Sequence, residues 1–267
     1  MINESKSSYA LITGASLGIG KAIAFELAAK NHNLILVALP GRELEQTAVE
    51  LRLKFSVDVL DFGVDLTREE TPEEIYDFVQ SRKISINILI NNAGRGTSGM
   101  FHRSDRELNN YMVKLNNMAM VGISHLFINM LLAQPEAWIM NVSSMEATLP
   151  LPYKTVYTAT KAFIYAFSLA LNEELKGTNV SVCVLCPGGV LTTEDGLKRA
   201  KSMGWKAKIM IKSPDFVAKK AISDMFKGKL VSIPGIVPYA IVKIMKLFPT
   251  KLKMKTLEKV FRAYKDH

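Results

Sequence analysis

Short apolar segments alternate with segments of helical periodicity along most of the chain. The apolar runs are typical of buried strands, and the segments between them repeat apolar positions every three to four residues, as helices do. The predicted strands are 9–13, 33–39, 57–62, 86–90, 137–143, 179–185 and 229–233. The predicted helices are 20–30, 42–55, 72–81, 104–132, 156–175 and 214–226.

This alternation predicts an α/β fold. Strands that are apolar on both faces favour a parallel sheet with helices on both sides, that is, a Rossmann-type doubly wound, mostly parallel sheet. No repeat or low-complexity linker interrupts the pattern before about residue 235. We therefore expect one domain over residues 1–235 and a separate extension over residues 236–267.

Composition excludes disorder and a disulfide scaffold. Apolar residues make up 48% of the chain and charged residues 22%, which suits a large packed core. The two cysteines, Cys183 and Cys186, lie in one apolar run on opposite faces of the predicted strand. This placement disfavours both a disulfide and a metal pair, so we expect buried thiols, a reducing compartment and no metal site.

The first chemical signal is the segment TGASLGIG, residues 13–20, between the first predicted strand and the first predicted helix. Glycines let a backbone turn sharply and approach a pyrophosphate, and the helix N-terminus attracts its charge. The spacing here is G-x-x-x-G-x-G and departs from G-x-G-x-x-G. An ordinary strand-to-helix turn is the alternative interpretation.

Tyr157 and Lys161 are four residues apart on a predicted helix, which places the ammonium beside the phenol. A tyrosine needs such a neighbour to exchange protons near neutral pH, because its ordinary pKa is about 10. Ser144 ends a predicted strand at the edge where ligands bind in such sheets. Its neighbour Ser143 competes for that role, and a surface Tyr/Lys pair is the alternative interpretation of Tyr157 and Lys161.

Together these segments resemble the short-chain dehydrogenase/reductase family. The similarity runs from about residue 9 to residue 233, and its pieces occur in the family's order. They are TGASLGIG, Asp65 in VDL, NNAG at 91–94, Asn116 in KLNN, Ser144 in NVSS, YTATK at 157–161 and PGGVLT at 187–192. The resemblance implies an oxidoreductase that interconverts a ketone and a secondary alcohol by hydride transfer.

The resemblance also implies a catalytic tetrad. Tyr157 would exchange the proton, Ser144 would polarise the carbonyl oxygen, and Lys161 would lower the pKa of the tyrosine and bind ribose hydroxyls. Asn116, in competition with Asn117, would hold a water molecule. The alternative function is a catalytically idle nucleotide-binding or membrane-surface scaffold of the same fold.

The resemblance also implies a cofactor site. Asp65 and Leu66 would flank the adenine, Asn92 to Gly94 the adenosine ribose, and Pro187 to Thr192 the nicotinamide. The implied cofactor residues are Gly14, Ser16, Leu17, Gly18, Ile19, Gly20, Arg42, Asp65, Leu66, Asn92, Ala93, Gly94, Tyr157, Lys161, Pro187, Gly188, Val190 and Thr192, with Thr193 as an alternative to Thr192.

The end of the second predicted strand bears on which nucleotide is used. An acid there would bind the ribose 2′-hydroxyl of NAD, and a nearby arginine the 2′-phosphate of NADP. The strand runs into Ala38-Leu39-Pro40-Gly41-Arg42, with no acid and no arginine directly after the alanine. We therefore favour NADP(H) with Arg42 as the candidate contact, and NAD(H) stays open.

The segment 189–212 would cover the substrate in this family. It carries Leu191, Leu197, Met203, Trp205, Ile209, Met210 and Ile211, which favours a hydrophobic substrate. By resemblance we also expect a homo-oligomer that pairs through the helices 104–132 and 156–175.

Charge sets the C-terminal quarter apart. The chain carries a net +9, but residues 1–197 sum to −5 and residues 198–267 to +14. The segment 238–248 is apolar but too short to span a bilayer, and 251–265 predicts a basic amphipathic helix. This tail is expected to bind a membrane surface, to cap the substrate mouth or to contact another copy.

No nucleic-acid partner is expected, because the chain has no motif that reads nucleic acids. No secretory signal is visible, so we expect a cytoplasmic protein, peripheral to a membrane if the tail binds one.

Overall fold

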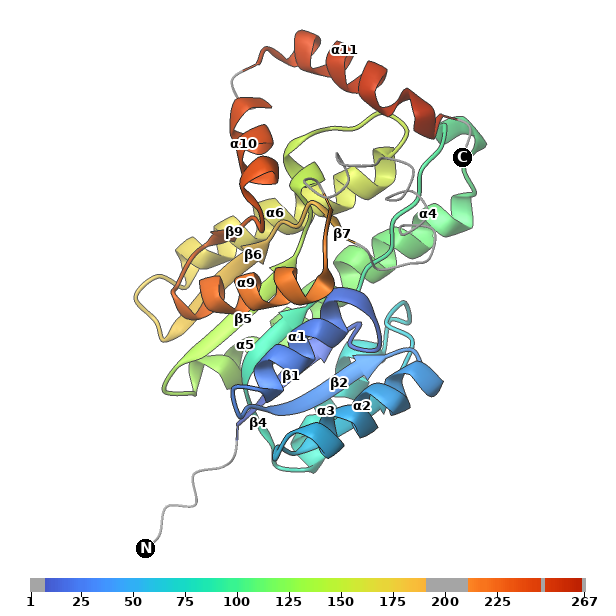
Figure 1. Cartoon of the computed structure of the whole chain (residues 1–267). Coiled ribbons are helices and arrows are strands. Elements are labelled where there is room, and N and C mark those ends of the chain that lie inside the picture. Colours follow the sequence, from blue (N-terminus) through green and yellow to red (C-terminus); the bar gives the residue numbers. More distant parts are fainter. Residues whose placement is uncertain (1–7, 191–210, 246–247, 266–267) are drawn as a thin grey trace, which may run out of the picture.

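The computed structural model describes residues 8–190, 211–245 and 248–265. Its centre is a seven-stranded sheet in the order β3-β2-β1-β4-β5-β6-β9, and all six strand pairs are parallel (Figure 1). The strands are β1 (Ser8–Thr13), β2 (Asn33–Ala38), β3 (Val59–Gly63), β4 (Ser85–Asn91), β5 (Ala137–Val142), β6 (Val180–Leu185) and β9 (Val231–Ser232). The predicted fold class is confirmed.

Helices cover both faces of the sheet. One buried cluster joins the sheet to α1 (Gly18–Ala28), α2 (Arg42–Lys54) and α9 (Pro214–Phe226). A second cluster joins the opposite face to α3 (Thr71–Ser81), α5 (Ala119–Leu132) and the end of α6 (Thr155–Glu174). The strands are apolar on both faces because both faces are packed against helices.

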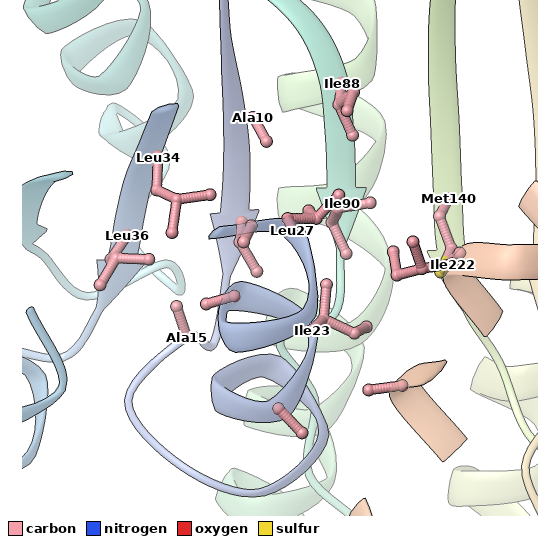
Figure 2. Packing of buried hydrophobic residues seen from close by; sticks show 14 of the residues in the cluster. Ala10, Ala15, Ile23, Leu27, Leu34, Leu36, Ile88, Ile90, Met140 and Ile222 are labelled. Atoms are coloured by element: carbon pink, nitrogen blue, oxygen red, sulfur yellow. The ribbon is translucent and has the colours of Figure 1, made fainter. Parts of the chain in front are cut away.

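The first cluster shows how a helix is fixed on the sheet. Ile23 and Leu27 lie four residues apart on α1, and they share one fully buried cluster with Ile88 and Ile90 of β4 (Figure 2). Burying each such side chain stabilises the fold by about 1.5–3 kcal/mol. This packing fixes α1 directly after the glycine loop and thereby positions the loop.

The chain reverses its direction of travel across the sheet at β1. Strand β1 pairs with β2 on one side and with β4 on the other. In open α/β sheets the ligand crevice lies at such a switch point, beyond the carboxyl ends of the strands. The glycine loop follows β1, and the NNAG turn follows β4, so both reach this edge.

The long predicted helix 104–132 is divided in the structure. It consists of α4 (Arg106–Val113), a π-helical turn (Lys114–Met118) and α5. In the described residues, the stretch Arg106–Leu132 is the one helix that is long and apolar enough to cross a membrane, yet 44% of its apolar window is buried inside the protein. We interpret it as a core helix, since α5 packs against the sheet.

Two short strands of the structure lie outside the predicted set. β7 (Gly189–Val190) pairs in parallel with β8 (Ile211–Lys212), which brings together the two ends of the segment predicted to cover the substrate. Most of that segment, residues 191–210, lies outside the described residues, including Thr192, Thr193 and the apolar positions from Leu191 to Met210. Cys183 and Cys186 are both buried and not joined in a disulfide, as predicted.

The C-terminal segment forms α10 (Ile236–Met245), α11 (Thr250–Phe261) and a 3-10 turn (Arg262–Tyr264), at the end of the molecule away from the N-terminus (Figure 1). Leu257 on α11 is 5% exposed and packs with Leu149 and Leu151 of the domain. Of the three roles left open by the sequence, the structure therefore shows the basic helix docked on its own domain.

Candidate active site

A cavity of about 770 Å³ lies at the carboxyl edge of the sheet. The glycine loop and the NNAG turn line one side, and the segments after β5 and β6 line the other. Among the predicted residues, the lining includes Gly14, Ser16, Leu17, Gly18, Ile19, Asn92, Ala93, Gly94, Ser144, Tyr157, Lys161, Pro187, Gly188 and Val190.

The glycine loop is packed too closely for any side chain at its key positions. A Cβ at Gly20 would lie 2.1 Å from the carbonyl oxygen of Gly14, and Gly14 itself has a φ of +64°. Helix α1 begins at Gly18 with no side chain capping its N-terminus and no acidic residue in its first turn. This cradle fits the pyrophosphate of a dinucleotide, because free backbone N–H groups and a positive dipole end meet it there.

A buried threonine joins this loop to the NNAG turn. Thr13 Oγ1 accepts hydrogen bonds from the backbone N–H groups of Asn92 (3.0 Å) and Ala93 (3.1 Å). In return, Asn92 Nδ2 donates to the carbonyl oxygens of Thr13 (2.9 Å) and Gly14 (3.0 Å). Sequence reasoning missed Thr13, although it begins the TGASLGIG motif.

Ser144 and Tyr157 meet at the cavity, which Ser143 also lines. Ser143 Oγ is buried and donates to the backbone oxygen of Lys161 at 2.7 Å, so its hydroxyl secures the fold. Ser144 Oγ accepts from the backbone N–H of Glu146 at 3.1 Å and is also hydrogen-bonded to the Tyr157 side chain. The geometry therefore favours Ser144 over Ser143 as the serine that faces a ligand.

Burial dominates the electrostatics of Tyr157. Burial, followed by the nearby charge of Glu146, raises its pKa above the ordinary value, and the hydrogen bond with Ser144 acts in the opposite direction. The resemblance implied that Lys161 would lower this pKa. The net shift in the structure is upward because the tyrosine is partly buried and an anion, Glu146, lies beside it.

Lys161 is an almost completely buried ammonium group. Its Nζ lies 6.0 Å from the centroid of the Tyr157 ring and donates to the carbonyl oxygen of Val142 at 2.9 Å. Burial lowers the pKa of Lys161 to about 8. Because this pKa lies near neutral pH, the protonation state of Lys161 responds strongly to any charge brought into the cavity.

Asn116 lies just behind the cavity, in the π-helical turn. Its Oδ1 accepts from the backbone N–H of Arg95 (2.9 Å), and its Nδ2 donates to the Arg95 carbonyl (3.0 Å) and to Thr160 Oγ1 (2.9 Å). The amide thus fastens the chain after NNAG to α6. Its neighbour Asn117 donates to the Thr160 carbonyl, so both asparagines support α6.

The remaining predicted residues stand away from the cavity lining. Gly20 packs behind the loop, and Leu66 is buried in the core. Arg42 is exposed at the start of α2, and Asp65 Oδ1 accepts two hydrogen bonds from Thr67, so the carboxylate shapes its own turn. Contacts of these four residues with a nucleotide stay predictions.

Several lining residues were missed from the sequence. Glu146 and Lys154 lie between Ser144 and Tyr157 along the chain, and Tyr264 comes from the C-terminal turn. The signal for Tyr264 was present, because it belongs to the apolar stripe of the tail helix. Nothing in the local sequence pattern indicated that Glu146 would face the cavity.

A doubly wound sheet with a glycine cradle at its switch point, and a tyrosine, a lysine and a serine beside it, defines a dinucleotide-binding protein of the dehydrogenase class. The chain belongs to the short chain dehydrogenase family, whose model matches residues 8–202.

The chain is similar to several characterised proteins of this kind. It is 33% identical to 17-beta-hydroxysteroid dehydrogenase type 3 of Homo sapiens over 192 residues, covering 71% of this chain and 61% of the relative. It is 32% identical to very-long-chain 3-oxoacyl-CoA reductase of Bos taurus, covering 72% and 62%. The matched region thus spans about three fifths of the length of these relatives.

Solved structures share the fold over nearly the whole chain. A structure of L-sorbose reductase from Gluconobacter frateurii with NADPH and L-sorbose has a TM-score of 0.77 at 28% identity, covering 86% of this chain and 95% of that one. A structure from work on 7beta-hydroxysteroid dehydrogenase stereoselectivity has a TM-score of 0.86 at 24% identity, covering 96% and 98%. At that identity the second likeness concerns the fold alone.

Proposed function

We propose that this protein is an NAD(P)(H)-dependent oxidoreductase that interconverts a ketone and a secondary alcohol on a hydrophobic substrate, in the reductive direction. The observation that carries the proposal is the convergence of Ser144, Tyr157 and Lys161 on one cavity beside the glycine cradle. All four tetrad positions hold competent residue types, which counts against the alternative of an idle scaffold.

Tyr157 and Ser144 act on the carbonyl oxygen of the substrate. A bound nicotinamide supplies or accepts the hydride at the carbonyl carbon. In reduction, the phenol of Tyr157 gives its proton to the carbonyl oxygen, while the Ser144 hydroxyl hydrogen-bonds that oxygen and polarises the C=O bond. The raised pKa of Tyr157 suits this direction, because the phenol then stays protonated and ready to donate at neutral pH.

The remaining members of the tetrad act on Tyr157 and on the nucleotide. The Lys161 ammonium stabilises the phenolate left by proton transfer and would hydrogen-bond the nicotinamide ribose of a bound nucleotide. Gly14, Gly18 and the N-terminus of α1 would hold the pyrophosphate of that nucleotide. Asn116 holds the chain behind Gly94 in place and positions the water molecule implied by the family resemblance.

For the nucleotide we propose NADP(H), with Arg42 as the contact to the 2′-phosphate. Arg42 is exposed at the start of α2, and the preceding strand ends without an acid. Arg42→Ala should raise the KM for NADPH and leave that for NADH nearly unchanged. A specificity constant with NADH equal to or above that with NADPH would overturn this preference.

For the substrate we propose a bulky hydrophobic carbonyl compound. Two of the similar proteins are named for hydroxysteroids and very-long-chain 3-oxoacyl-CoA, both of which contain large apolar groups. Ile211, at the described end of the predicted cover, is half-buried. These observations support a hydrophobic substrate.

One experiment tests the function directly. A panel of ketones and 3-oxoacyl thioesters is assayed with NADPH and NADH, using the full chain and Tyr157→Phe. We expect turnover of hydrophobic ketones by the wild type, and loss of turnover with retained nucleotide binding in Tyr157→Phe. Nucleotide binding without turnover of any compound by the wild type would favour the scaffold alternative, and unchanged turnover in Tyr157→Phe would refute the mechanism.

We also propose a homo-oligomer that pairs through α5 and α6. Both helices expose large apolar side chains, among them Val121 on α5 and Phe163 on α6, and Met118 is exposed just before α5. Light scattering behind size exclusion should give a multiple of 29.7 kDa. Phe163→Glu should return the protein toward a monomer.

For location we propose the cytoplasm, with peripheral binding to anionic membranes through the exposed lysines of α11, which include Lys251, Lys255 and Lys259. The docked state of α11 leaves these cations accessible. The protein should sediment with anionic liposomes at low salt, and failure to do so would remove the membrane proposal.

A further inference from the structure

The docked helix α11 covers the segment that connects the two central catalytic residues. Residues 145–154 run from Ser144 to the beginning of α6, and Tyr157 lies in the first turn of that helix. Three kinds of contact join this catalytic connection (residues 145–154) to α11 and the turn that follows it.

The first contact is apolar. Leu149 and Leu151 of the catalytic connection are 5% and 3% exposed, and they form one cluster with Leu257 of α11. Phe261 and Met245 pack around this cluster. Leaving Leu257 exposed would cost about 1.5–3 kcal/mol, so the docked position is the stable one for this face of the helix.

The second contact is a hydrogen bond. Tyr153 Oη donates to Glu258 Oε1 at 3.0 Å, and Glu258 also forms an ion pair with Arg262 at 2.8 Å. Glu258 follows Leu257 directly, so polar and apolar contacts hold the same turn of α11. The orientation of the helix on the domain is therefore fixed as well as its position.

The third contact runs from the tail to the catalytic tyrosine through one ammonium group. Lys154 Nζ lies 5.0 Å from the ring centroid of Tyr264 and 5.8 Å from that of Tyr157. The same Nζ is 2.8 Å from Glu146 Oε1 and 5.9 Å from the Phe261 ring. Cations over aromatic faces contribute about 0.5–2 kcal/mol, more when desolvated, and Lys154 is 17% exposed.

Through Tyr264, the C-terminal turn lines the cavity itself. It lines the same 770 Å³ space as Ser144, Tyr157 and the glycine loop. A helix that only covered the surface of the domain would leave this lining to the domain's own residues. The tail instead supplies an aromatic side chain at the end of the cavity where Glu146 and Lys154 lie.

We propose that α11 and residues 262–264 are a wall of the substrate chamber, and that Tyr264 is a specificity-determining residue that favours bulky fused-ring ketones over small ones. The proposal deepens the proposed oxidoreductase function and rests on it. Tyr264 lines the cavity with its ring stacked on Phe261, 5.8 Å between the ring centroids, which holds this aromatic side chain in place. A bulky ketone bound at Tyr157 reaches the side chain of Tyr264, whereas a small ketone reaches Tyr157 without touching this wall.

Substrate selectivity tests the role of Tyr264. Wild type, Tyr264→Ala and Tyr264→Phe are assayed with NADPH on 2-decalone and cyclohexanone. We expect the ratio of kcat/KM for 2-decalone over cyclohexanone to fall at least about tenfold in Tyr264→Ala, through KM, and to be retained in Tyr264→Phe. Val260→Ala, at a 65% exposed position of the same helix, is the matched control and should keep the ratio. A ratio in Tyr264→Ala that is unchanged or raised would overturn the proposal.

Hydrogen exchange tests the wall independently of turnover. Leu257→Asp should undock α11, so peptides from the catalytic connection should exchange faster while those from the glycine loop, residues 13–20, stay unchanged. Leu252→Asp, at a 49% exposed position of α11, is the control. Unchanged exchange over residues 145–154 in Leu257→Asp would contradict the proposal that α11 is a wall of the substrate chamber. If the wild type turns over no ketone, the proposed function is refuted. The hydrogen-exchange result still shows, independently, whether α11 holds the catalytic connection in place.

Discussion

The carboxylate of Glu146 and the ammonium of Lys154 form an ion pair of 2.8 Å beside Tyr157. Both side chains are less than one fifth exposed, at 19% and 17%. In the described part of the chain, Glu146 Oε2 is buried without a hydrogen-bond partner, so this carboxylate keeps much of its electrostatic influence. That influence falls on Tyr157, whose pKa it raises.

Glu146→Gln should therefore lower the pKa of Tyr157. The negative charge that disfavours the phenolate is removed, and the Lys154 cation, which favours the phenolate, stays. In the reductive reaction the loss of activity at high pH should begin at a lower pH than in the wild type. The measurement is the pH profile of kcat/KM with a ketone substrate.

The matched control for this variant is Glu173→Gln. Glu173 belongs to an exposed ion pair with Lys176, far from the cavity lining. Its pH profile should coincide with that of the wild type. A profile for Glu146→Gln that stays in place, or moves to higher pH, would show that Glu146 does not act on the tyrosine.

The buried Lys161 makes stability depend on pH in a predictable direction. Its pKa in the folded protein is about 8, below the ordinary value of 10.5, so between these two values the unfolded chain binds more protons. Stability due to this group therefore rises with pH over that range. Relative to Lys161→Met, the wild type should gain about 2 kcal/mol of unfolding free energy between pH 8 and pH 10.

Urea unfolding of both proteins at several pH values measures this difference. Because the comparison is between wild type and variant, the other titrating groups cancel. Lys219→Met, at an exposed position of α9, controls for the loss of a lysine as such. A difference between wild type and Lys161→Met that stays constant, or shrinks as pH rises, would contradict the buried, weakly basic state of Lys161.

The order of the elements could be predicted because each one buries its apolar residues within its own short span. The strand predicted at 33–39 is β2 at Asn33–Ala38, and the helix predicted at 214–226 is α9 over the same residues. The glycine loop could be predicted for the same reason, since a strand, a turn and a helix are local features. The π-helical turn at Lys114–Met118 could not be predicted, because the contacts made there by Asn116 and Asn117 are with α6, far away in the sequence.

The walls of the site depended on contacts between distant segments, which sequence patterns do not specify. Tyr153 and Glu258 are 105 positions apart, and Thr13 and Asn92 are 79 apart. The apolar stripe that includes Leu257 was visible in the sequence. Whether it would face a membrane or the domain was not, because both surfaces remove the same apolar area from water.

Two glycines of the site should affect different steps when replaced. A Cβ at Gly20 would meet the backbone oxygen of Gly14 at 2.1 Å, so Gly20→Ala must shift the loop. A Cβ at Gly96 would lie 2.9 Å from Cδ2 of the Tyr157 ring, so Gly96→Ala must move the proton donor. We expect Gly20→Ala to weaken NADPH binding at least about tenfold, or 1.4 kcal/mol.

Gly96→Ala should instead lower kcat about ten- to a hundredfold, with the Kd for NADPH nearly unchanged, because small misplacements of a reacting group are costly. Titration calorimetry with NADPH and steady-state kinetics separate the two effects, and each variant is the control for the other. Equal losses of binding and turnover in both variants would indicate a general loss of folding rather than these local clashes.

Thr13→Val should destabilise the protein and loosen the nucleotide site together. The valine has nearly the same shape, but it leaves the partly buried N–H groups of Asn92 and Ala93 without the acceptor they have in Thr13 Oγ1. A fully buried donor left unpaired costs about 1–3 kcal/mol, so the two partly buried donors together should cost about 2 kcal/mol in urea unfolding. Thr13→Ser keeps the hydroxyl and loses one methyl group, worth about 0.8 kcal/mol.

NADPH binding should weaken in Thr13→Val and persist in Thr13→Ser, because the hydroxyl holds the NNAG turn against the glycine loop. A Thr13→Val protein as stable as Thr13→Ser would show that the two N–H groups do not depend on this acceptor.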